Sequence, residues 1–123
     1  MVTRALVAVV DDDESVRESL PDLLRQFGFA AQPFSSAESF LASGILDKTS
    51  CLVLDIAMPY MSGPELQQEL IRRRLQIPIV FITANGDETT RQRVIAQGAV
   101  ALLVKPFSET ALLDAINTAL RKK

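Results

Sequence analysis

Three uninterrupted runs of apolar residues constrain the fold of this chain more than any other feature. The runs are Leu6–Val10, Cys51–Leu54 and Ile79–Ile82. A strand with one face in water alternates apolar and polar side chains, so a continuous apolar run indicates a strand that is covered on both faces. Such strands are typical of a parallel sheet that lies between two layers of helices.

Two further runs complete a regular alternation of strands and helices. The five predicted strands are Arg4–Val10, Ala30–Phe34, Cys51–Leu54, Ile77–Ile82 and Val100–Val104. Apolar residues at helical spacing predict helices over Ser15–Phe27, a segment from Pro64 and a segment from Ser108, and further helices are expected over Ala37–Ala42 and Glu88–Gln97. Five strand–helix units predict a three-layer α/β domain of the (βα)5 type with right-handed crossovers.

Two of these helices have unusual sequences. Glu88–Gln97 has no apolar residue before Val94, so we expect a short or mobile helix there. Pro21 lies inside the first helix, where it removes one backbone hydrogen bond and predicts a kink.

Length and charge limit what the chain can be. Its 123 residues are enough for one domain with its own core. A net charge of −2 gives no overall attraction to nucleic acid or to a membrane surface. The first apolar run is short and is followed at once by acidic residues, unlike a secretory leader or a membrane span. We therefore expect a cytoplasmic protein with no direct nucleic-acid or membrane partner.

The chain contains no histidine and a single cysteine, Cys51. The lack of histidine excludes Ser-His-Asp and Cys-His catalytic sites and histidine-ligated zinc. One cysteine cannot form an internal disulfide, which fits a reducing compartment. Because Cys51 begins an apolar strand, we expect it to be a core residue.

Polar residues stand directly after four of the predicted strands. They are Asp11, Asp12 and Asp13 after the first strand, Asp55 after the third, Thr83 after the fourth and Lys105 after the fifth. The carboxyl ends of parallel strands open on one edge of the sheet, so these side chains are expected in one pocket. An all-oxygen donor set suits a hard ion such as Mg2+, and a lysine and a hydroxyl suit phosphoryl oxygens. The pattern therefore indicates Mg2+-assisted phosphoryl transfer onto an aspartate.

Each of these residues also has an ordinary structural interpretation. Asp13 or Ser15 is expected to cap the next helix, and a lone Asp55, Thr83 or Lys105 is typical of a turn or of a solvated surface. Their convergence on one sheet edge favours the functional interpretation.

Four motifs resemble the receiver domain of two-component response regulators. They are Val9-Val10-Asp11-Asp12, Leu54-Asp55-Ile56-Ala57-Met58-Pro59-Tyr60-Met61-Ser62-Gly63, Ile82-Thr83-Ala84 and Val104-Lys105-Pro106-Phe107. The match keeps order and spacing over essentially the whole chain. It implies a flavodoxin-like fold with strand order 2-1-3-4-5. Residues 1–123 would form one receiver, either complete or the N-terminal part of a longer regulator with a helix-turn-helix output domain.

The resemblance also implies a role for each matching residue. Asp55 would accept the phosphoryl group. Asp12, Asp55 and the backbone carbonyl of Ala57 would hold Mg2+ or Mn2+, and Asp11 would reach the ion through water. Thr83 would hydrogen-bond the aspartyl phosphate, and Lys105 would pair with it.

The resemblance further implies partners and a conformational response. A cis peptide is expected between Lys105 and Pro106. The phosphodonor would be a sensor histidine kinase, and the receiver would control an output domain in cis or an effector protein, or form a phosphorylation-dependent homodimer. Phosphorylation would shift the Asn85–Leu103 surface between two arrangements. In this interpretation the domain is a signalling phosphoacceptor and not an enzyme.

Three departures from the family pattern involve four positions. Leu102 stands where the family has an aromatic switch residue. Ala57 and Asn85 occupy positions that tune hydrolysis, and because alanine cannot orient a water molecule we hypothesise a long-lived aspartyl phosphate that is limited chiefly by Asn85. Pro21 lies in the helix on which family kinases dock.

Two other functions remain open at this point. Asp11-x-Asp13 after an apolar strand also resembles the haloacid-dehalogenase phosphatases, with Asp11 as nucleophile and Asp13 as acid/base. That alternative leaves Asp55 and its Met-Pro loop unexplained. The other alternative is an interaction module that has lost phosphorylation, although all the expected site residues are present.

Overall fold

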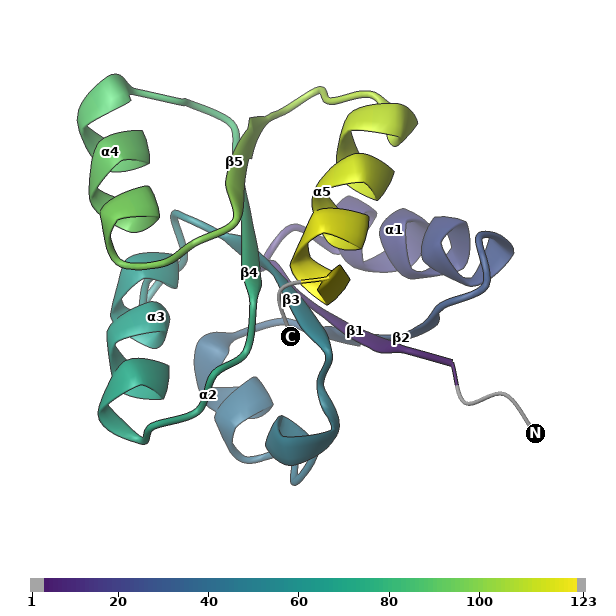
Figure 1. Ribbon diagram of the computed structural model, residues 1–123, viewed down its shortest axis with the longest axis horizontal. Coiled ribbons are helices and arrows are strands. Elements are labelled where there is room, and N and C mark those ends of the chain that lie inside the picture. The colour runs from purple at the N-terminus through teal and green to yellow at the C-terminus, as the bar shows by residue number, and fades with distance from the viewer. Residues whose placement is uncertain (1–3, 122–123) are drawn as a thin grey trace.

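The computed structural model describes residues 4–121, which form a five-stranded parallel sheet in the order β2-β1-β3-β4-β5 (Figure 1). This is the predicted flavodoxin-like order. The strands are β1 (Leu6–Val10), β2 (Ala30–Phe34), β3 (Cys51–Asp55), β4 (Ile79–Thr83) and β5 (Ala101–Val104).

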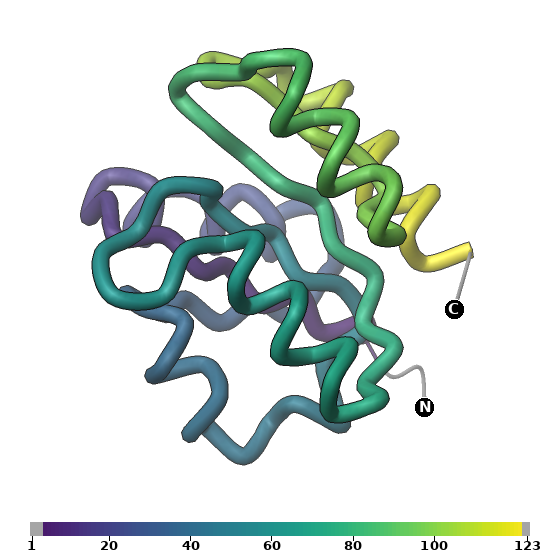
Figure 2. The backbone as a smooth tube through the Cα atoms, turned by 90° about the vertical axis from the view of Figure 1, so that its left-hand side faces the viewer, coloured from purple at the N-terminus to yellow at the C-terminus, as the bar shows by residue number. Residues whose placement is uncertain are grey.

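Helices cover both faces of the sheet. They are α1 (Glu14–Gln26), α2 (Ala37–Leu41), α3 (Gly63–Arg72), α4 (Glu88–Ala96) and α5 (Glu109–Arg121), with a short 3-10 helix at Leu46–Lys48 that the sequence pattern did not predict. Helices α1 and α5 pack on one face, and α2, α3 and α4 pack on the other (Figures 1 and 2). Among residues 4–121, no helix is both long enough and apolar enough to span a bilayer.

The continuous apolar strands divide their side chains between two hydrophobic layers. In β1, Val7 and Val9 pack under α1 and α5, whereas Ala8 and Val10 pack under the other three helices. All four side chains are fully buried. This explains the uninterrupted apolar run, because successive residues of a strand point to opposite faces and here both faces are covered.

Several element boundaries differ from the sequence prediction by one or two residues. Arg4 is exposed, and β1 begins at Leu6. Strand β4 begins after Pro78, which has no N–H to donate to the ladder. Asp55 and Thr83 were predicted to follow their strands, but they are the last residues of β3 and β4 and still pair with the neighbouring strands.

Helices α1 and α4 show how their unusual sequences are accommodated. Helix α1 continues through Pro21, whose side chain is buried, and the kink stays a prediction. Within Glu88–Ala96, all of which the structure describes, Val94 is the one buried residue of α4. Helix α4 is therefore the most weakly anchored of the longer helices, and its mobility stays a prediction.

The C-terminus of α3 contains a residue in an unfavourable backbone conformation. Arg74 has φ 60°, and the N–H groups of Arg74 and Leu75 donate to the carbonyls of Ile71 and Leu70. This is a Schellman motif with arginine at the position that normally holds glycine. Gly98, with φ 105°, occupies the same position after α4.

Replacing Arg74 by glycine should therefore stabilise the domain. We expect Arg74→Gly to raise the free energy of unfolding by about 0.5–1 kcal/mol in urea denaturation, because glycine adopts a positive φ without a Cβ clash. The matched control is Arg73→Gly, where φ is −81° and the guanidinium pairs with Glu69, and this change should destabilise. Equal effects of the two substitutions would contradict the assignment.

Candidate functional site at the acidic sheet edge

A polar pocket of about 330 Å3 lies at the carboxyl edge of the sheet. The predicted residues Asp11, Asp12, Asp55, Ala57, Thr83 and Lys105 line it, whereas Leu102 and Pro106 are not among its lining residues. The lining residues are Asp11, Asp12, Asp13, Asp55, Ile56, Ala57, Thr83, Ala84, Asn85, Asp87, Thr90 and Lys105. The topology therefore brings together the ends of β1, β3, β4 and β5, as the strand-end pattern predicted.

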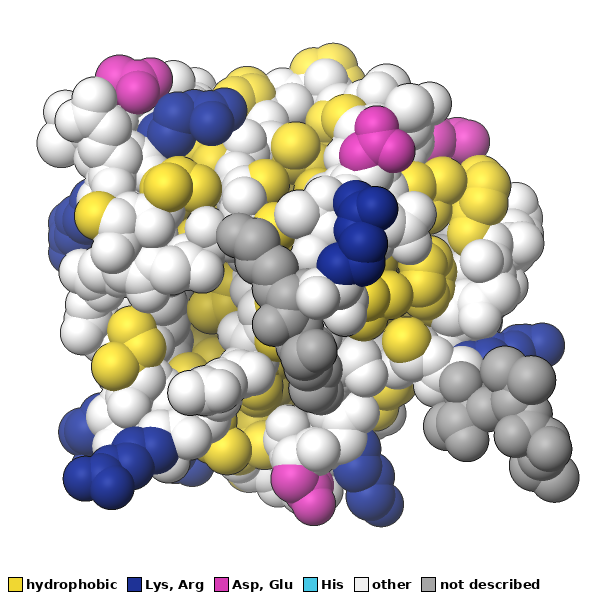
Figure 3. Space-filling model, in the orientation of Figure 1, with side chains coloured by type: hydrophobic (Ala, Val, Ile, Leu, Met, Phe, Trp, Pro, Cys, Tyr) yellow, Lys and Arg dark blue, Asp and Glu magenta, His cyan; other side chains and the backbone are white. Residues whose placement is uncertain are grey.

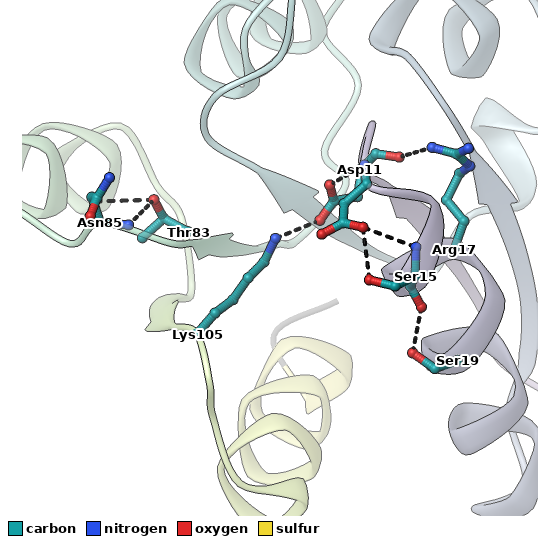
Figure 4. A network of polar contacts seen from close by, with 8 residues as sticks. Asp11, Ser15, Arg17, Ser19, Thr83, Asn85 and Lys105 are labelled. Atoms are coloured by element: carbon teal, nitrogen blue, oxygen red, sulfur yellow. Dashed lines mark hydrogen bonds and ion pairs between the residues drawn. The ribbon is translucent and has the colours of Figure 1, made fainter.

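Asp11 is the fixed point of the pocket. Its carboxylate is fully buried and accepts hydrogen bonds at 2.9 Å from the Asp13 N–H and at 2.9 Å from Lys105 Nζ. Its backbone carbonyl accepts a 3.1 Å hydrogen bond from Arg17, as Figure 4 shows. Sequence reasoning did not single out Arg17, because no motif marks a side chain that contacts only a backbone carbonyl.

Asp55 is placed by its strand and by the close approach of Gly63. The N–H of Gly63 donates to the carbonyl of Ile56 at 3.0 Å. A Cβ at position 63 would lie 2.2 Å from the carbonyl oxygen of Asp55, so only glycine fits against the end of β3. Met58, in the intervening loop, is buried in the core. The Met-Pro…Gly pattern thus holds the loop beside Asp55.

Three carboxylates of the pocket are close enough to share a cation. One oxygen each from Asp11, Asp12 and Asp55 lies within 4.8 Å of the others. The donor set is entirely oxygen and includes an exposed carboxylate at Asp12, which suits Mg2+ that keeps some of its waters. Ala57, the predicted carbonyl ligand, lines the same pocket.

The crowding of charge changes the acidity of these groups. Burial, and next the nearby Asp11 carboxylate, raise the pKa of Asp55 to about 7. Burial is the largest single influence on the pKa of Lys105 and would lower it, but the hydrogen bond to Asp11 and the charges of Asp11 and Asp55 together outweigh burial and raise the pKa. Lys105 is therefore positively charged at neutral pH. The pocket disfavours the negative charge on Asp55.

Thr83 does not point its hydroxyl at the acidic cluster. Its Oγ1 donates to the Asn85 carbonyl at 3.1 Å and accepts from the Asn85 N–H at 3.2 Å. Figure 4 shows this pair apart from the Lys105–Asp11 ion pair. The phosphate contacts expected of Thr83 and Lys105 therefore require both side chains to exchange their present partners.

Two other expected features lie next to the pocket. The peptide bond between Lys105 and Pro106 is cis. Leu102, the predicted switch residue, is 2% exposed and packs in the core layer that contains Val94 of α4. Its role as a switch stays a prediction.

Asp13 has a structural role in α1. Its Oδ1 accepts hydrogen bonds from the Ser15 N–H at 2.9 Å and the Ser15 hydroxyl at 2.8 Å, so Asp13 is the N-cap of α1. These bonds lower the pKa of Asp13. A general acid near neutral pH needs a raised pKa, so this geometry does not support Asp13 as a phosphatase acid/base.

The raised pKa of Asp55 predicts that removing its charge increases the stability of the fold, by an amount that depends on pH. In the folded chain Asp55 keeps a proton that the unfolded chain releases, so stability falls as pH rises from about 4 to about 7. In EDTA at pH 8 we expect Asp55→Asn to be more stable than the wild type by on the order of 2 kcal/mol in urea denaturation. At pH 4 the two should be nearly equal.

The control is Asp13→Asn, which removes a carboxylate with a lowered pKa and should give no gain at pH 8. An Asp55→Asn variant that is no more stable than the wild type at pH 8 would contradict the electrostatic description.

Sequence comparisons agree with this geometry. The family model for the response regulator receiver domain matches residues 7–117. Nodulation protein W of Bradyrhizobium diazoefficiens is 47% identical over 117 residues, which cover 95% of this chain and 52% of that protein. Transcriptional regulatory protein FixJ of Rhizobium meliloti is 40% identical over 118 residues, which cover 96% of this chain and 58% of that protein. The chain spans about half the length of the curated relatives it matches.

Solved structures give the same result. The response regulator StyR superposes with a TM-score of 0.90 at 49% identity, covering 98% of this chain and 61% of that chain. The structure of FixJ-N superposes with a TM-score of 0.88 at 37% identity, covering 99% of this chain and 98% of that chain. With the family match over most of its length, the chain belongs to the receiver domains of two-component response regulators.

Proposed function

We propose that Asp55 accepts a phosphoryl group from a phosphohistidine of a sensor kinase. The observation that carries the proposal is the convergence of Asp55 with two other carboxylates and Lys105 in one pocket. A carboxylate oxygen of Asp55 would form the new P–O bond while the P–N bond to the donor histidine breaks. The electron pair of that bond returns to the imidazole, and the product is an aspartyl phosphate.

The residues present fit a magnesium site. Asp11, Asp12 and Asp55 would hold Mg2+ or Mn2+, together with the backbone carbonyl of Ala57. The ion would offset the repulsion between the carboxylates and stabilise charge on the phosphoryl oxygens during transfer.

Lys105 and Thr83 would respond to the new phosphate. Lys105 would leave Asp11, with which it now pairs at 2.9 Å, and place its ammonium on a phosphoryl oxygen. The Thr83 hydroxyl would turn from Asn85 toward the phosphate. Asn85 would then lose both backbone contacts with the Thr83 hydroxyl.

The loss of these contacts would alter the start of α4. Asp87 caps α4 by accepting from the Thr90 N–H at 2.7 Å, and both residues line the pocket. The Asn85–Leu103 surface would shift in population toward a second arrangement, which would control an output domain, an effector or pairing with a second receiver. Relatives of the chain include the transcriptional regulatory proteins TdiR and FixJ, which favours a transcriptional output.

The phosphatase alternative fits the pocket less well. It needs Asp13 as an acid, but Asp13 caps α1 and has a lowered pKa. It also needs Asp11 as the nucleophile, although Asp11 already accepts hydrogen bonds on both carboxylate oxygens. The full set of site residues likewise argues against a silent interaction module.

Intact mass spectrometry after incubation with acetyl phosphate tests the phosphoacceptor. We expect wild-type protein to gain one phosphoryl group, about 80 Da, only when Mg2+ is present. Asp55→Asn should gain nothing. A gain that persists in Asp55→Asn and is lost in Asp11→Asn would favour the phosphatase, and no gain in wild type would favour the silent module.

The lifetime of the phosphate is a separate prediction. Because Ala57 cannot hold a water molecule in line with phosphorus, we expect the phosphorylated protein to persist for minutes or longer with Mg2+ after the donor is removed. Asn85→Ala should lengthen this lifetime several-fold, because Asn85 has the one side-chain amide among the lining residues of the pocket and we expect that amide to assist hydrolysis. Loss of phosphate within seconds in the wild type would refute the prediction.

A further inference from the structure

Helix α4 combines one buried apolar side chain with several polar contacts to its neighbours. Val94 is its one buried residue, and Ile95 is 39% exposed. A hollow of about 840 Å3 lies between the C-terminal ends of α3 and α4, with Gln67, Gln97 and Gly98 among its lining residues. Apolar residues, among them Leu70, Ile71 and Ile77, also line this hollow, and Val94 is the one buried residue of α4.

Gln67, one of the residues that line this hollow, makes a buried contact between α3 and α4. It lies on α3, is 3% exposed, and donates from Nε2 to the carbonyl oxygen of Val94 at 3.1 Å in a buried hydrogen bond. The same carbonyl accepts the N–H of Ala99 at 3.0 Å, which closes the C-terminal turn of α4. The Gln67 amide thus binds the last turn of α4 to α3.

Two other polar contacts of α4 lie nearer to solvent. Arg91 donates to the Leu102 carbonyl at 3.1 Å, and Gln68 donates to the side chain of Gln97. Arg91, Gln68 and Gln97 are exposed, so water competes for these contacts. Water does not compete in the same way for the buried amide of Gln67.

We infer that the Gln67 amide is the latch that holds the C-terminal end of α4 against α3 and sets how readily the helix detaches. The N-terminal end of α4 is joined to the acidic pocket through Thr83, Asn85 and Asp87. The helix is therefore held at one end by the pocket and at the other by Gln67. The regulatory part of this inference rests on the proposed phosphorylation of Asp55. The structural part, that Gln67 holds the end of α4, does not depend on phosphorylation.

The latch and the phosphate would act against each other. If α4 must leave Gln67 when Asp55 is phosphorylated, the loss of that hydrogen bond makes the phosphorylated state less favourable. By linkage, phosphorylation makes the hydrogen bond from Gln67 less favourable by the same amount. Weakening the latch should therefore make α4 more mobile in the free protein and make phosphorylation of Asp55 more favourable. Gln67 is accordingly a positioning residue, which acts through α4 and does not contact the reacting atoms.

The test compares Gln67→Met with Gln68→Met in the 123-residue chain. Methionine keeps the length of the side chain and removes the donor, while Val94 retains its bond from Ala99. Hydrogen exchange of the unphosphorylated protein should show the α4 amides, Val94 to Ala96, exchanging about 2- to 10-fold faster in Gln67→Met. In Gln68→Met the α4 amides should exchange at the wild-type rate. The amides of β3 should exchange at the wild-type rate in both variants.

A second readout measures the coupling between the Gln67 hydrogen bond and phosphorylation of Asp55. The fraction phosphorylated at a fixed, limiting acetyl phosphate concentration should rise in Gln67→Met and not in Gln68→Met. Unchanged exchange in α4, or an equal rise in β3 and α4, would overturn the latch. Faster α4 exchange with an unchanged phosphorylated fraction would overturn its regulatory role. If wild-type protein were never phosphorylated, the proposed function would fail, and the exchange result would still decide the latch.

Discussion

Repulsion between carboxylates at one edge of the sheet is the constraint on which the site depends. The ends of β1, β3, β4 and β5 deliver acidic or polar groups to the same small volume, and the Lys105–Asp11 ion pair offsets part of the repulsion. The compensation is incomplete, as the raised pKa of Asp55 shows. A cation and a phosphoryl group, each of which changes this balance of charge, are therefore the ligands to which the pocket is most sensitive.

The parts of the fold differ in how firmly they are held, and the difference follows from burial. Strands β1, β3 and β4 place side chains in both hydrophobic layers, so the backbone that carries Asp55 is fixed. Helix α4 has little apolar anchorage and begins at the same pocket. On the face shown in Figure 3, hydrophobic side chains are scattered among polar atoms, without one dominant apolar patch. A rigid site beside a weakly held helix is the arrangement that a conformational signal needs.

Much of this organisation could be predicted from the sequence. Continuous apolar runs predicted strands covered on both faces, and the structure confirms the sheet order and the edge on which the polar residues meet. The Gly63 position was recognised from its motif, and its physical reason, the contact with the Asp55 carbonyl, needs coordinates. The single buried residue of α4 follows from its polar sequence.

Other features depend on which partner a side chain selects among several within reach. Lys105 pairs with Asp11, and Thr83 bonds to the Asn85 backbone, whereas the family resemblance implies phosphate contacts for both. The Gln67–Val94 bond joins residues 27 positions apart, and a glutamine on a helix gives no sequence signal of a distant carbonyl. The apolar run predicts that β3 ends at Leu54, whereas Asp55 completes the strand.

Magnesium binding with simultaneous measurement of proton release tests the central electrostatic claim most directly. Calorimetric titration of the wild type at pH 6.5, in two buffers with different ionisation enthalpies, reports both quantities. We expect the wild type to bind Mg2+ at one site with release of a fraction of a proton, since Asp55 is partly protonated at this pH, and Asp55→Asn to bind more weakly without proton release. Absence of binding, or equal binding with equal proton release in both proteins, would contradict it.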